Sequence, residues 1–377
     1  MDLPPLTYLS FDSLSEGVGA SQVTPYVERI ATRDMQITLH SLEKTEPAQP
    51  LRDRLRSAGI HWVPHAFGRP GSSGGIARVL RAARWVRGAD LVHARSDLAA
   101  ASCLLGRPEH WLWDVRGLWA DERIELGALA TGSPQEKVMR RIESASARQA
   151  GAAVTLSAAI VSELARRHGP AIREKVFVVT TCVDLERFEL TGPLPLDPAH
   201  LVLSGTLNTR YDVPAMIRLA NSFAKRCEAV LDVVRPVPST WDGILAEAGA
   251  RLSSSSPADM PQVMARATAG LCLLTPGRTR SSLGSMPTKL GEFLSSGRPV
   301  VVSAGLGDMP ELLARHSCGV VVEDRSDEGL DAAAEALYDL AEDGETPKRC
   351  RALAEEHFDL DRGVDRLISA YRHALAA

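Results

Sequence analysis

The sequence has no large excess of either charge, no long apolar run and no paired cysteines. Its 43 basic and 47 acidic residues give a formal net charge of −4, so the charge balance calls for no nucleic-acid partner. No window offers 18 uninterrupted apolar residues, which argues against a membrane-spanning helix. The six cysteines form no CxxC pair and have no metal-ligand spacing. These absences predict a cytoplasmic protein with reduced thiols, and they leave peripheral membrane contact open.

What the sequence does have is length and a regular alternation of patterns. With 377 residues, 45% hydrophobic and 24% charged, two domains of ordinary size are expected. Short apolar runs alternate with helical patterns, which predicts parallel sheets covered by helices on both faces. The stretch FELTGPLPLDPAH, with three prolines and one glycine, is the predicted linker. The predicted strands lie at 6–11, 35–39, 60–63, 91–93, 111–115, 152–155 and 176–179 before this linker, and at 201–204, 229–233, 269–274, 300–303 and 319–322 after it.

The densest group of polar side chains lies in SSLGSMPTKLGEFLSSGRPVVVSAGLGD, at residues 281–308. Pro287 suits the first turn of a helix, where its missing N–H costs nothing. Thr288 and Lys289 follow at once, so a hydroxyl, an ammonium and backbone N–H groups converge at the start of this helix. Such a helix start attracts anions, phosphate above all. Glu292 lies one turn further, and the segment predicts a site for the diphosphate and ribose of a nucleotide-activated sugar.

Two neighbouring features extend this predicted donor site. The stretch GTLNTRY directly follows the first strand after the linker, and its Gly205 would permit close approach of a ligand. Thr206, Asn208 and Arg210 can donate hydrogen bonds to phosphate oxygens. The same residues could equally form an ordinary turn, and the sequence leaves both interpretations open. Ser285, just before the helix, is a further candidate for donor binding.

In the first half, WLWDVRGLWADE runs from a strand into a loop rich in charge. The strand ends near Asp114, and Arg116, Asp121 and Glu122 follow. Ligands of open α/β sheets bind at the carboxyl ends of strands, so these groups are predicted to meet the acceptor or the donor sugar. Trp119 could stack on a sugar face. The alternative is a salt bridge within the loop beside a buried tryptophan.

A glycine pair follows the first strand, in FDSLSEGVGASQ. Gly17 and Gly19 would let the backbone approach a ligand closely. A dinucleotide fingerprint needs another glycine three residues after Gly19, where Gln22 stands, although Glu43 could imitate the acid that binds a ribose. A plain turn between strand and helix competes with this interpretation, and a dinucleotide-dependent oxidoreductase remains a minor alternative.

The predicted helix Gly75–Arg87 carries an apolar stripe with arginines beside it. Arg78, Arg81 and Arg84 lie off the stripe. This pattern could bring the helix onto anionic lipid headgroups, while a solvated basic face is the simpler alternative. The stripe consists of Ile76, Val79, Leu80, Ala83 and Val86.

The only DxD pattern of the sequence, Asp359-Leu360-Asp361, stands at the start of the last predicted helix. Asp361 is well suited to cap that helix, and this role is favoured over metal binding. Since no other pair of carboxylates suggests a metal site, neither a metal nor another cofactor is expected.

Taken together, these segments resemble family 4 glycosyltransferases, the retaining enzymes of the GT-B fold. The resemblance rests on GVGASQV, DVRGLWADE, LSAAIVSEL, VVTTCVDLERF, GTLNTRY, SMPTKLGEFLSSGRPVV and GLGD. It implies two doubly wound, Rossmann-like α/β domains that face each other across a cleft. Residues 1–190 would be the acceptor domain and 191–356 the donor domain, with the helix at 357–377 crossing back to the first domain.

The resemblance also implies an activity: metal-independent transfer of a sugar, as by a hexosyltransferase, from a nucleotide-diphosphate sugar to an acceptor hydroxyl with retention. Lys289, Glu292, Arg116 and Asp114 would be the catalytic residues, with Glu292 matching the glutamate that holds the donor ribose. Better-known members carry two glutamates here, of which Glu292 matches the second; Gly284 stands at the position of the first, which contacts the sugar. A glycan, a lipid-linked sugar and a natural product all stay open as acceptors. A degenerate nucleotide-binding partner subunit and a GT-B sugar-nucleotide epimerase are the alternatives.

Overall fold

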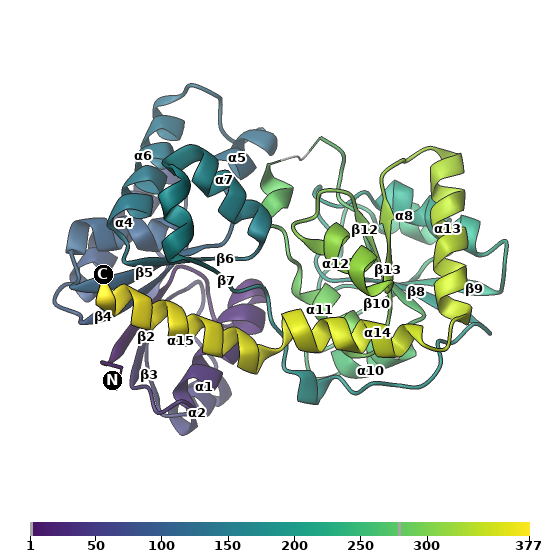
Figure 1. Cartoon of the computed structure of the whole chain (residues 1–377), viewed down its shortest axis with the longest axis horizontal. Coiled ribbons are helices and arrows are strands. Elements are labelled where there is room, and N and C mark those ends of the chain that lie inside the picture. Colours follow the sequence, from purple (N-terminus) through teal and green to yellow (C-terminus); the bar gives the residue numbers. More distant parts are fainter. Residues whose placement is uncertain (1–2, 278–279) are drawn as a thin grey trace. The chain divides into compact units, whose positions relative to one another are not determined.

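The structure is a computed structural model that describes residues 3–277 and 280–377, and the chain forms two compact units. Unit 1 extends to Thr180 and includes Leu360–Ala377, whereas unit 2 is Thr181–Asp359 (Figure 1). Residues 181–190 and 357–359, predicted in the first domain, group with unit 2. A hydrogen bond accounts for part of this grouping, since the Val183 backbone N–H donates to the Phe358 carbonyl at 2.7 Å.

Unit 1 is built on a seven-stranded parallel sheet in the order β3-β2-β1-β4-β5-β6-β7, with helices on both faces (Figure 1). Its strands are β1 (Leu6–Ser10), β2 (Ile37–Glu43), β3 (Ile60–Ala66), β4 (Leu91–Arg95), β5 (His110–Val115), β6 (Ala152–Thr155) and β7 (Val176–Val178). Its α-helices are α1 (Thr24–Ala31), α2 (Gln49–Ser57), α3 (Gly71–Trp85), α4 (Asp97–Gly106), α5 (Trp119–Glu125), α6 (Pro134–Gln149), α7 (Ala158–His168) and α15 (Leu360–Ala376).

Unit 2 repeats the design with a six-stranded parallel sheet in the order β10-β9-β8-β11-β12-β13. Its strands are β8 (Ala199–Ser204), β9 (Ala229–Val234), β10 (Arg251–Ser253), β11 (Ala269–Cys272), β12 (Val300–Ser303) and β13 (Gly319–Val322). Its α-helices are α8 (Val213–Phe223), α9 (Asp242–Glu247), α10 (Met260–Arg266), α11 (Thr288–Ser295), α12 (Met309–His316), α13 (Asp327–Glu342) and α14 (Thr346–Leu353). The predicted pair of Rossmann-like α/β domains is confirmed.

In both sheets the strand order reverses once, and this point determines where a ligand is expected. The chain starts in the middle of the sheet, builds strands to one side and then returns to build the other side. The reversal falls between β1 and β4 in unit 1 and between β8 and β11 in unit 2. Loops leave in opposite directions from the carboxyl ends of the two strands, which opens a crevice there in folds of this kind.

Local sequence explains how α11 is fixed in unit 2. The helix ends at Ser295, and Gly297 adopts the left-handed region with φ +77°. The Gly297 N–H donates to the Leu294 carbonyl at 3.0 Å, and the Arg298 N–H donates to the Phe293 carbonyl at 2.9 Å. These two bonds make the helix end that a glycine in this position favours. They fix the direction in which the chain enters the buried strand β12.

The C-terminal helix α15, yellow in Figure 1, packs on β5, β6 and β7 of unit 1. Asp361 lies in its first turn, where it accepts a hydrogen bond from Arg29 and one of 2.8 Å from Arg33. The carboxylate therefore serves to hold α15 against α1. Among the helices of the described residues, none is long and apolar enough to cross a membrane.

Candidate functional site

A buried polar cluster lies at the strand-order reversal of unit 1. Arg95 ends β4 and is only 2% exposed. Its Nε donates to the Asp12 carboxylate at 3.0 Å, and its Nη1 donates to the Asp114 carboxylate at 3.3 Å. Since Asp12 follows β1 and Asp114 lies in β5, this guanidinium joins three neighbouring strand ends.

The cluster is completed by Arg116 and Gln22. Arg116 Nη1 donates to the Asp114 carboxylate at 3.4 Å, and its Nη2 donates to Gln22 Oε1 at 2.7 Å. Arg95 Nη2 donates to the same Gln22 oxygen at 3.0 Å. The structure thus brings the predicted residues Asp114 and Arg116 together. Sequence reasoning missed Arg95, Asp12 and Gln22 as members of this cluster.

Asp114 is ionised in this setting. Burial alone would raise its pKa, but Arg116, a hydrogen bond with His93 and Arg95 together hold the pKa of Asp114 well below its usual range. Burial lowers the pKa of His93, which is therefore neutral and stacks on the Tyr8 ring at 4.1 Å between centroids. The cluster combines two guanidinium groups and one buried carboxylate, a set that can orient hydroxyl or phosphate groups of a ligand.

The three remaining predicted residues of this region have other neighbours. Asp121 is buried and accepts hydrogen bonds from Arg140 at 2.6 and 2.9 Å and from Arg167 at 2.9 Å. Glu122 lies against Gly117, where an added Cβ would be 2.4 Å from its Oε1. Trp119 lines an apolar pocket between helices. The sequence left a structural salt bridge open as the alternative to a ligand site, and Asp121 forms such salt bridges with Arg140 and Arg167.

We expect Asp121→Asn to affect stability more than turnover. Its two arginine partners hold the pKa of Asp121 at about 2, against the opposing effect of burial. A lowered pKa stabilises the folded state above about pH 4, and this contribution is lost as the pH falls toward the folded-state value. The substitution should lower the free energy of unfolding at pH 7 by roughly 2 kcal/mol, measured by urea denaturation. A large loss of activity with unchanged stability would contradict this role.

Gly19, a predicted ligand-binding residue, fits tightly within its own loop. An added Cβ at Gly19 would lie 1.9 Å from the Ser13 carbonyl oxygen. Glu43 is buried and accepts hydrogen bonds from the Ser13 hydroxyl at 2.6 Å and the Leu14 N–H at 3.0 Å. Both residues therefore shape the turn after β1. The engagement of Glu43 speaks against a ribose acid and hence against the oxidoreductase alternative.

In unit 2, the loop after β8 is held in one conformation. Gly205 has φ +100°, a value that favours glycine, and its N–H donates to the Val234 carbonyl at 2.9 Å. Asn208 Oδ1 accepts from the Arg210 N–H at 2.9 Å, so this side chain forms the turn itself. Thr206 is exposed. The structure therefore supports the turn interpretation for Asn208, while Gly205 and Thr206 stay accessible.

Lys289 reaches from the first turn of α11 to the end of β8. Its Nζ donates to the Ser204 carbonyl at 2.9 Å and lies 4.2 Å from the centre of the Tyr211 ring. Burial alone would lower the pKa of Lys289, but Tyr211 and Cys272 raise it, so the ammonium stays charged. Pro287 is the N-cap and has no side-chain acceptor for the first-turn N–H groups. Positive charge is thus concentrated where the strand order reverses.

Glu292 lies one turn along α11 and is half-buried. Burial raises the pKa of Glu292 to about 7, although Arg187 and Lys289 act in the opposite direction. In the part of the chain that the structure describes, its carboxylate makes no hydrogen bond. Glu292 therefore has the capacity to accept hydrogen bonds from a ligand.

Ser285, the further donor-binding candidate, precedes the helix, and its hydroxyl donates to the Ser281 carbonyl at 3.2 Å.

Arg325, which follows β13, is a cation that the sequence did not indicate. Its Nη2 donates to the Ser303 hydroxyl oxygen at 2.8 Å, at the end of β12. That oxygen also accepts from the Leu274 N–H at 2.6 Å. Burial lowers the pKa of Arg325, and its Nη1 is buried without a hydrogen-bond partner in the described residues. Arg325 adds a second positive charge at the carboxyl ends of this sheet.

One group in unit 2 has the composition of a metal site. His316, Glu356 and His357 place their ligand atoms within 4.8 Å of one another. Glu356 lies 3.5 Å from His316 Nε2 and 3.1 Å from His357 Nε2. His316 ends α12 and so lies at the amino ends of the strands, the edge opposite Lys289. A metal held here would be remote from the proposed donor site.

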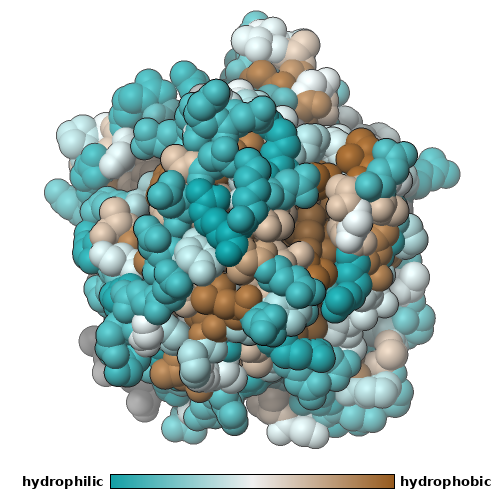
Figure 2. Space-filling view, turned by 90° about the vertical axis from the view of Figure 1, so that its right-hand side faces the viewer, coloured by the Kyte–Doolittle hydropathy of each residue, from teal (hydrophilic) through white to brown (hydrophobic). Residues whose placement is uncertain are grey.

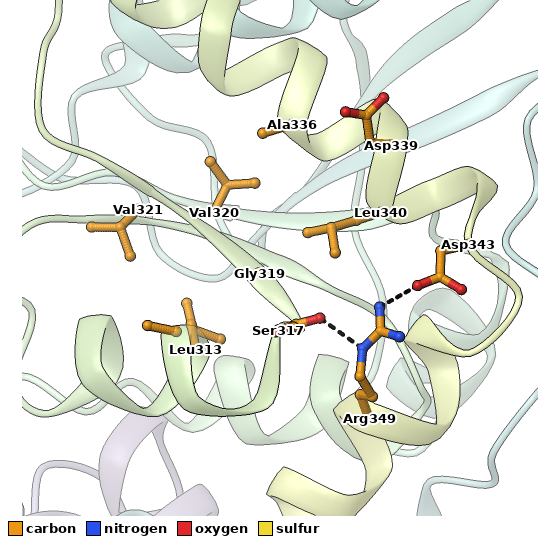
Figure 3. Close-up of a pocket in the computed structure, with 11 residues that line it drawn as sticks. Leu313, Ser317, Gly319, Val320, Val321, Ala336, Asp339, Leu340, Asp343 and Arg349 are labelled. Carbon is orange, nitrogen blue, oxygen red and sulfur yellow. Dashed lines mark hydrogen bonds and ion pairs between the residues drawn. The ribbon is translucent and has the colours of Figure 1, made fainter.

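A hollow of about 650 Å³ lies beside the edge strand β13, between α12 and α13 (Figure 3). Arg349 at its rim donates to the Ser317 carbonyl at 2.8 Å and pairs with Asp343 at 2.6 Å, so its charge is already satisfied. Figure 2, which looks at the right-hand side of Figure 1, shows hydrophobic areas separated by hydrophilic side chains. Such scattered areas are ordinary for a protein surface.

Comparison with known proteins supports one of these families for the first part of the chain. The family model described as a glycosyl transferase 4-like domain matches residues 19–180. The chain carries a glycosyl transferase 4-like domain. The predicted resemblance to family 4 glycosyltransferases is thereby confirmed, and glycosyl transfer is the class of activity that this domain supports. A search of curated proteins finds no match to the chain.

Solved structures agree with the glycosyl transferase 4-like domain at the level of fold. Sucrose-phosphate synthase from Thermosynechococcus elongatus has 15% identity and a TM-score of 0.72, covering 99% of both chains. A glycosyltransferase from Rickettsia africae has 13% identity and a TM-score of 0.70, also covering 99% of both. HepE of Anabaena in complex with UDP-glucose has 15% identity and a TM-score of 0.66, covering 97% of this chain and 99% of its own.

Proposed function

We propose that this chain transfers a sugar from a nucleotide-diphosphate sugar to an acceptor hydroxyl, with retention of the anomeric configuration. The glycosyl transferase 4-like domain and the two Rossmann-like units support this proposal. The observation that carries it is the Lys289 Nζ to Ser204 carbonyl bond of 2.9 Å, which holds an ammonium at the reversal of strand order in unit 2. That position is where folds of this kind bind nucleotides.

In this proposal the donor diphosphate lies at the start of α11. Breaking the sugar–phosphate bond leaves negative charge on the diphosphate, and Lys289 with the N-terminus of α11 stabilises that charge. Glu292 accepts hydrogen bonds from the ribose hydroxyls. Gly205 gives the diphosphate room close to the backbone, while Pro287 and Thr288 shape the helix start. UDP-glucose is the first donor to test, because the HepE structure contains it.

The residues of unit 1 take the second role in the proposal. Arg95, Arg116 and the ionised Asp114 orient hydroxyl groups of the acceptor or of the donor sugar. Retention, which the family resemblance implies, proceeds by attack of the acceptor hydroxyl on the face that the leaving phosphate occupies. The phosphate accepts the proton, so the enzyme supplies no nucleophile.

We further propose that transfer needs no metal ion, because Lys289 and α11 supply the positive charge that the leaving diphosphate requires. Dialysis against EDTA should therefore leave the initial rate of transfer unchanged, and adding Mg²⁺ or Mn²⁺ should not raise it. Loss of activity with EDTA that returns with one added metal would contradict metal independence while leaving the transferase assignment intact.

A panel of nucleotide sugars, incubated with and without a mixture of acceptors, tests the activity itself. Nucleotide release that depends on both donor and acceptor, with a product of unchanged anomeric configuration by NMR, is the expected result. Nucleotide binding without release under every condition would indicate the partner-subunit alternative. Release of nucleotide without any acceptor would indicate a sugar-nucleotide epimerase.

A further inference from the structure

Unit 1 contains a large apolar pocket that the proposed chemistry does not use. Helices α3, α4, α5 and α6 enclose a volume of about 780 Å³. Four large aliphatic side chains that line it remain exposed: Ile76 (63%), Leu80 (54%), Leu105 (53%) and Val138 (51%). Exposed hydrophobic residues are common singly, but a cluster of them around one concave surface marks a binding site. The volume is within the range of roughly 300–1,000 Å³ that small-molecule sites have.

The sequence of α3 explains why this space stays open. The helix begins Gly-Ser-Ser-Gly-Gly, so its first turn has no large side chain to fill the space. Gly74 packs its backbone so closely that an added Cβ would lie 1.8 Å from the Arg69 carbonyl oxygen. Ile76, Val79 and Leu80, predicted to lie on one apolar stripe, all line the pocket; Ile76 and Leu80 are exposed, whereas Val79 is buried. The opening is thus a consequence of small residues at one end of α3.

Two arginines in the pocket wall carry charges that no acidic side chain neutralises. Arg78 was predicted on a solvated face, but it is only 7% exposed and its guanidinium lies 4.0 Å from the centre of the Phe67 ring. Its Nη1 donates to the Arg69 carbonyl at 2.7 Å, while its Nε has no partner within the described residues. Arg123 of α5 also lines the pocket. Neither arginine forms an ion pair within the described ranges 3–277 and 280–377.

A hydrocarbon surface with unpaired guanidinium groups selects an amphiphile with an anionic group. Burying apolar surface contributes about 25 cal/mol per Å² to the free energy of binding. An aliphatic chain would therefore gain most of its affinity by burying its surface against the apolar walls of the pocket. The guanidinium groups then favour phosphate, with which arginine forms paired, charge-assisted hydrogen bonds. Neutral apolar ligands would leave both charges unpaired.

We propose that this pocket binds the alkyl or isoprenyl chain of a phosphorylated acceptor, with the phosphate at Arg78 and Arg123. The proposal rests on the proposed function and names the class of acceptor: a sugar or hydroxyl attached through phosphate to a hydrocarbon chain. Trp119, the predicted sugar-stacking residue, then contacts the chain of the acceptor as part of the pocket wall. In this proposal the protein binds the hydrocarbon chain directly, in the pocket, and a membrane is not needed to hold it.

The test is a calorimetric titration of the full-length protein with farnesyl phosphate, kept below its micellar concentration. Saturable binding with one site is expected, with weaker binding of farnesol and none of inorganic phosphate. Leu105→Glu places a like charge beside the phosphorylated chain and should weaken binding about tenfold or more, equivalent to at least about 1.4 kcal/mol. Val237→Glu alters an equally exposed aliphatic residue of unit 2 and should leave binding unchanged.

The charge contribution has its own pair of variants. Arg123→Gln should weaken farnesyl phosphate and leave farnesol unaffected, because only the phosphate is paired with the guanidinium. Arg84→Gln removes an exposed arginine of α3 that does not line the pocket and should change neither. Equal effects of both arginine variants would show general attraction to a basic surface and would overturn the proposed phosphate position.

Three results would overturn the pocket proposal. One is the absence of saturable binding, and another is binding to phosphatidylglycerol vesicles without binding of monomeric farnesyl phosphate. The third is a dimer of the wild-type protein that Leu105→Glu dissociates, which would show that a second copy covers this face. Binding of the panel of nucleotide sugars, UDP-glucose first, is measured on the same samples. Nucleotide-sugar binding without farnesyl phosphate binding refutes the pocket proposal alone. Absence of binding to every nucleotide sugar of the panel refutes the donor assignment separately.

Discussion

Replacing Lys289 by methionine should lower the rate of sugar transfer by about 10²–10³-fold, the effect expected when one charge-stabilising group is removed from the leaving group. Methionine keeps much of the aliphatic length that packs beside Tyr211, while the positive charge is lost. The rate at saturating donor is the measurement, because the charge on the leaving diphosphate develops only as the bond breaks.

This variant also loses the bond to the Ser204 carbonyl, so its fold must be checked separately. An unpartnered buried carbonyl costs about 1–3 kcal/mol, which a urea titration will detect. Lys225→Met is the matched control, since Lys225 is an exposed residue of unit 2 that pairs with Asp331 at 3.0 Å. Equal transfer rates of Lys289→Met and the wild type, both folded, would remove Lys289 from the donor site.

The fold could be predicted because its pattern is local. Strand β12 reads Val-Val-Val-Ser with every residue buried, and a run of this kind between a helix-ending glycine and a turn has few other interpretations. Strand β10, in contrast, was missed. It has three residues at the sheet edge, of which Arg251 and Ser253 are exposed, so no apolar run distinguishes it from a loop.

The members of the candidate site could be predicted only where they are close in sequence. Lys289 and Glu292 are three residues apart in the helix that follows Pro287, so their spacing places them on one face of it. Arg95 and Asp12 come from different strands, and only the order of strands in the sheet makes them neighbours. A charged residue that ends a buried strand, as Arg95 ends β4, is the one sequence feature that could have indicated this cluster.

Charge density in the sequence did not distinguish a ligand site from a structural ion pair. Asp114 and Asp121 stand in the same charged stretch, and both are buried with two arginines beside them. Their surroundings differ only in the fold. Asp114 lies beside the strand-order reversal, whereas Asp121 ties α5 to α6 and α7. Position at the carboxyl ends of the strands therefore separates the ligand role that we propose for Asp114 from the structural ion pair of Asp121, and only the fold supplies this position.

Replacing Glu292 by glutamine should make the protein more stable and less active at the same time. The folded-state pKa of about 7 lies above the value near 4.3 of an unfolded glutamate, so the folded state binds the proton more tightly. Wild-type stability therefore falls as the pH rises from about 4 to about 7, and above that the full cost of the buried charge remains. Because the side chain is half-exposed, we expect a gain on the order of 2 kcal/mol for Glu292→Gln at pH 8.

The same substitution removes the charged acceptor that we assign to the donor ribose. Losing a hydrogen bond to a charged group costs about 1.5–3 kcal/mol, so kcat/KM for the donor should fall roughly 10- to 100-fold. Urea titrations at pH 5 and pH 8 test the stability, and the difference between variant and wild type should be clearly larger at pH 8 than at pH 5. Glu228→Gln, at an exposed position, is the control. A residue that lowers stability is expected where function requires it. A Glu292→Gln variant that is more stable and fully active would show that Glu292 does not bind the donor ribose.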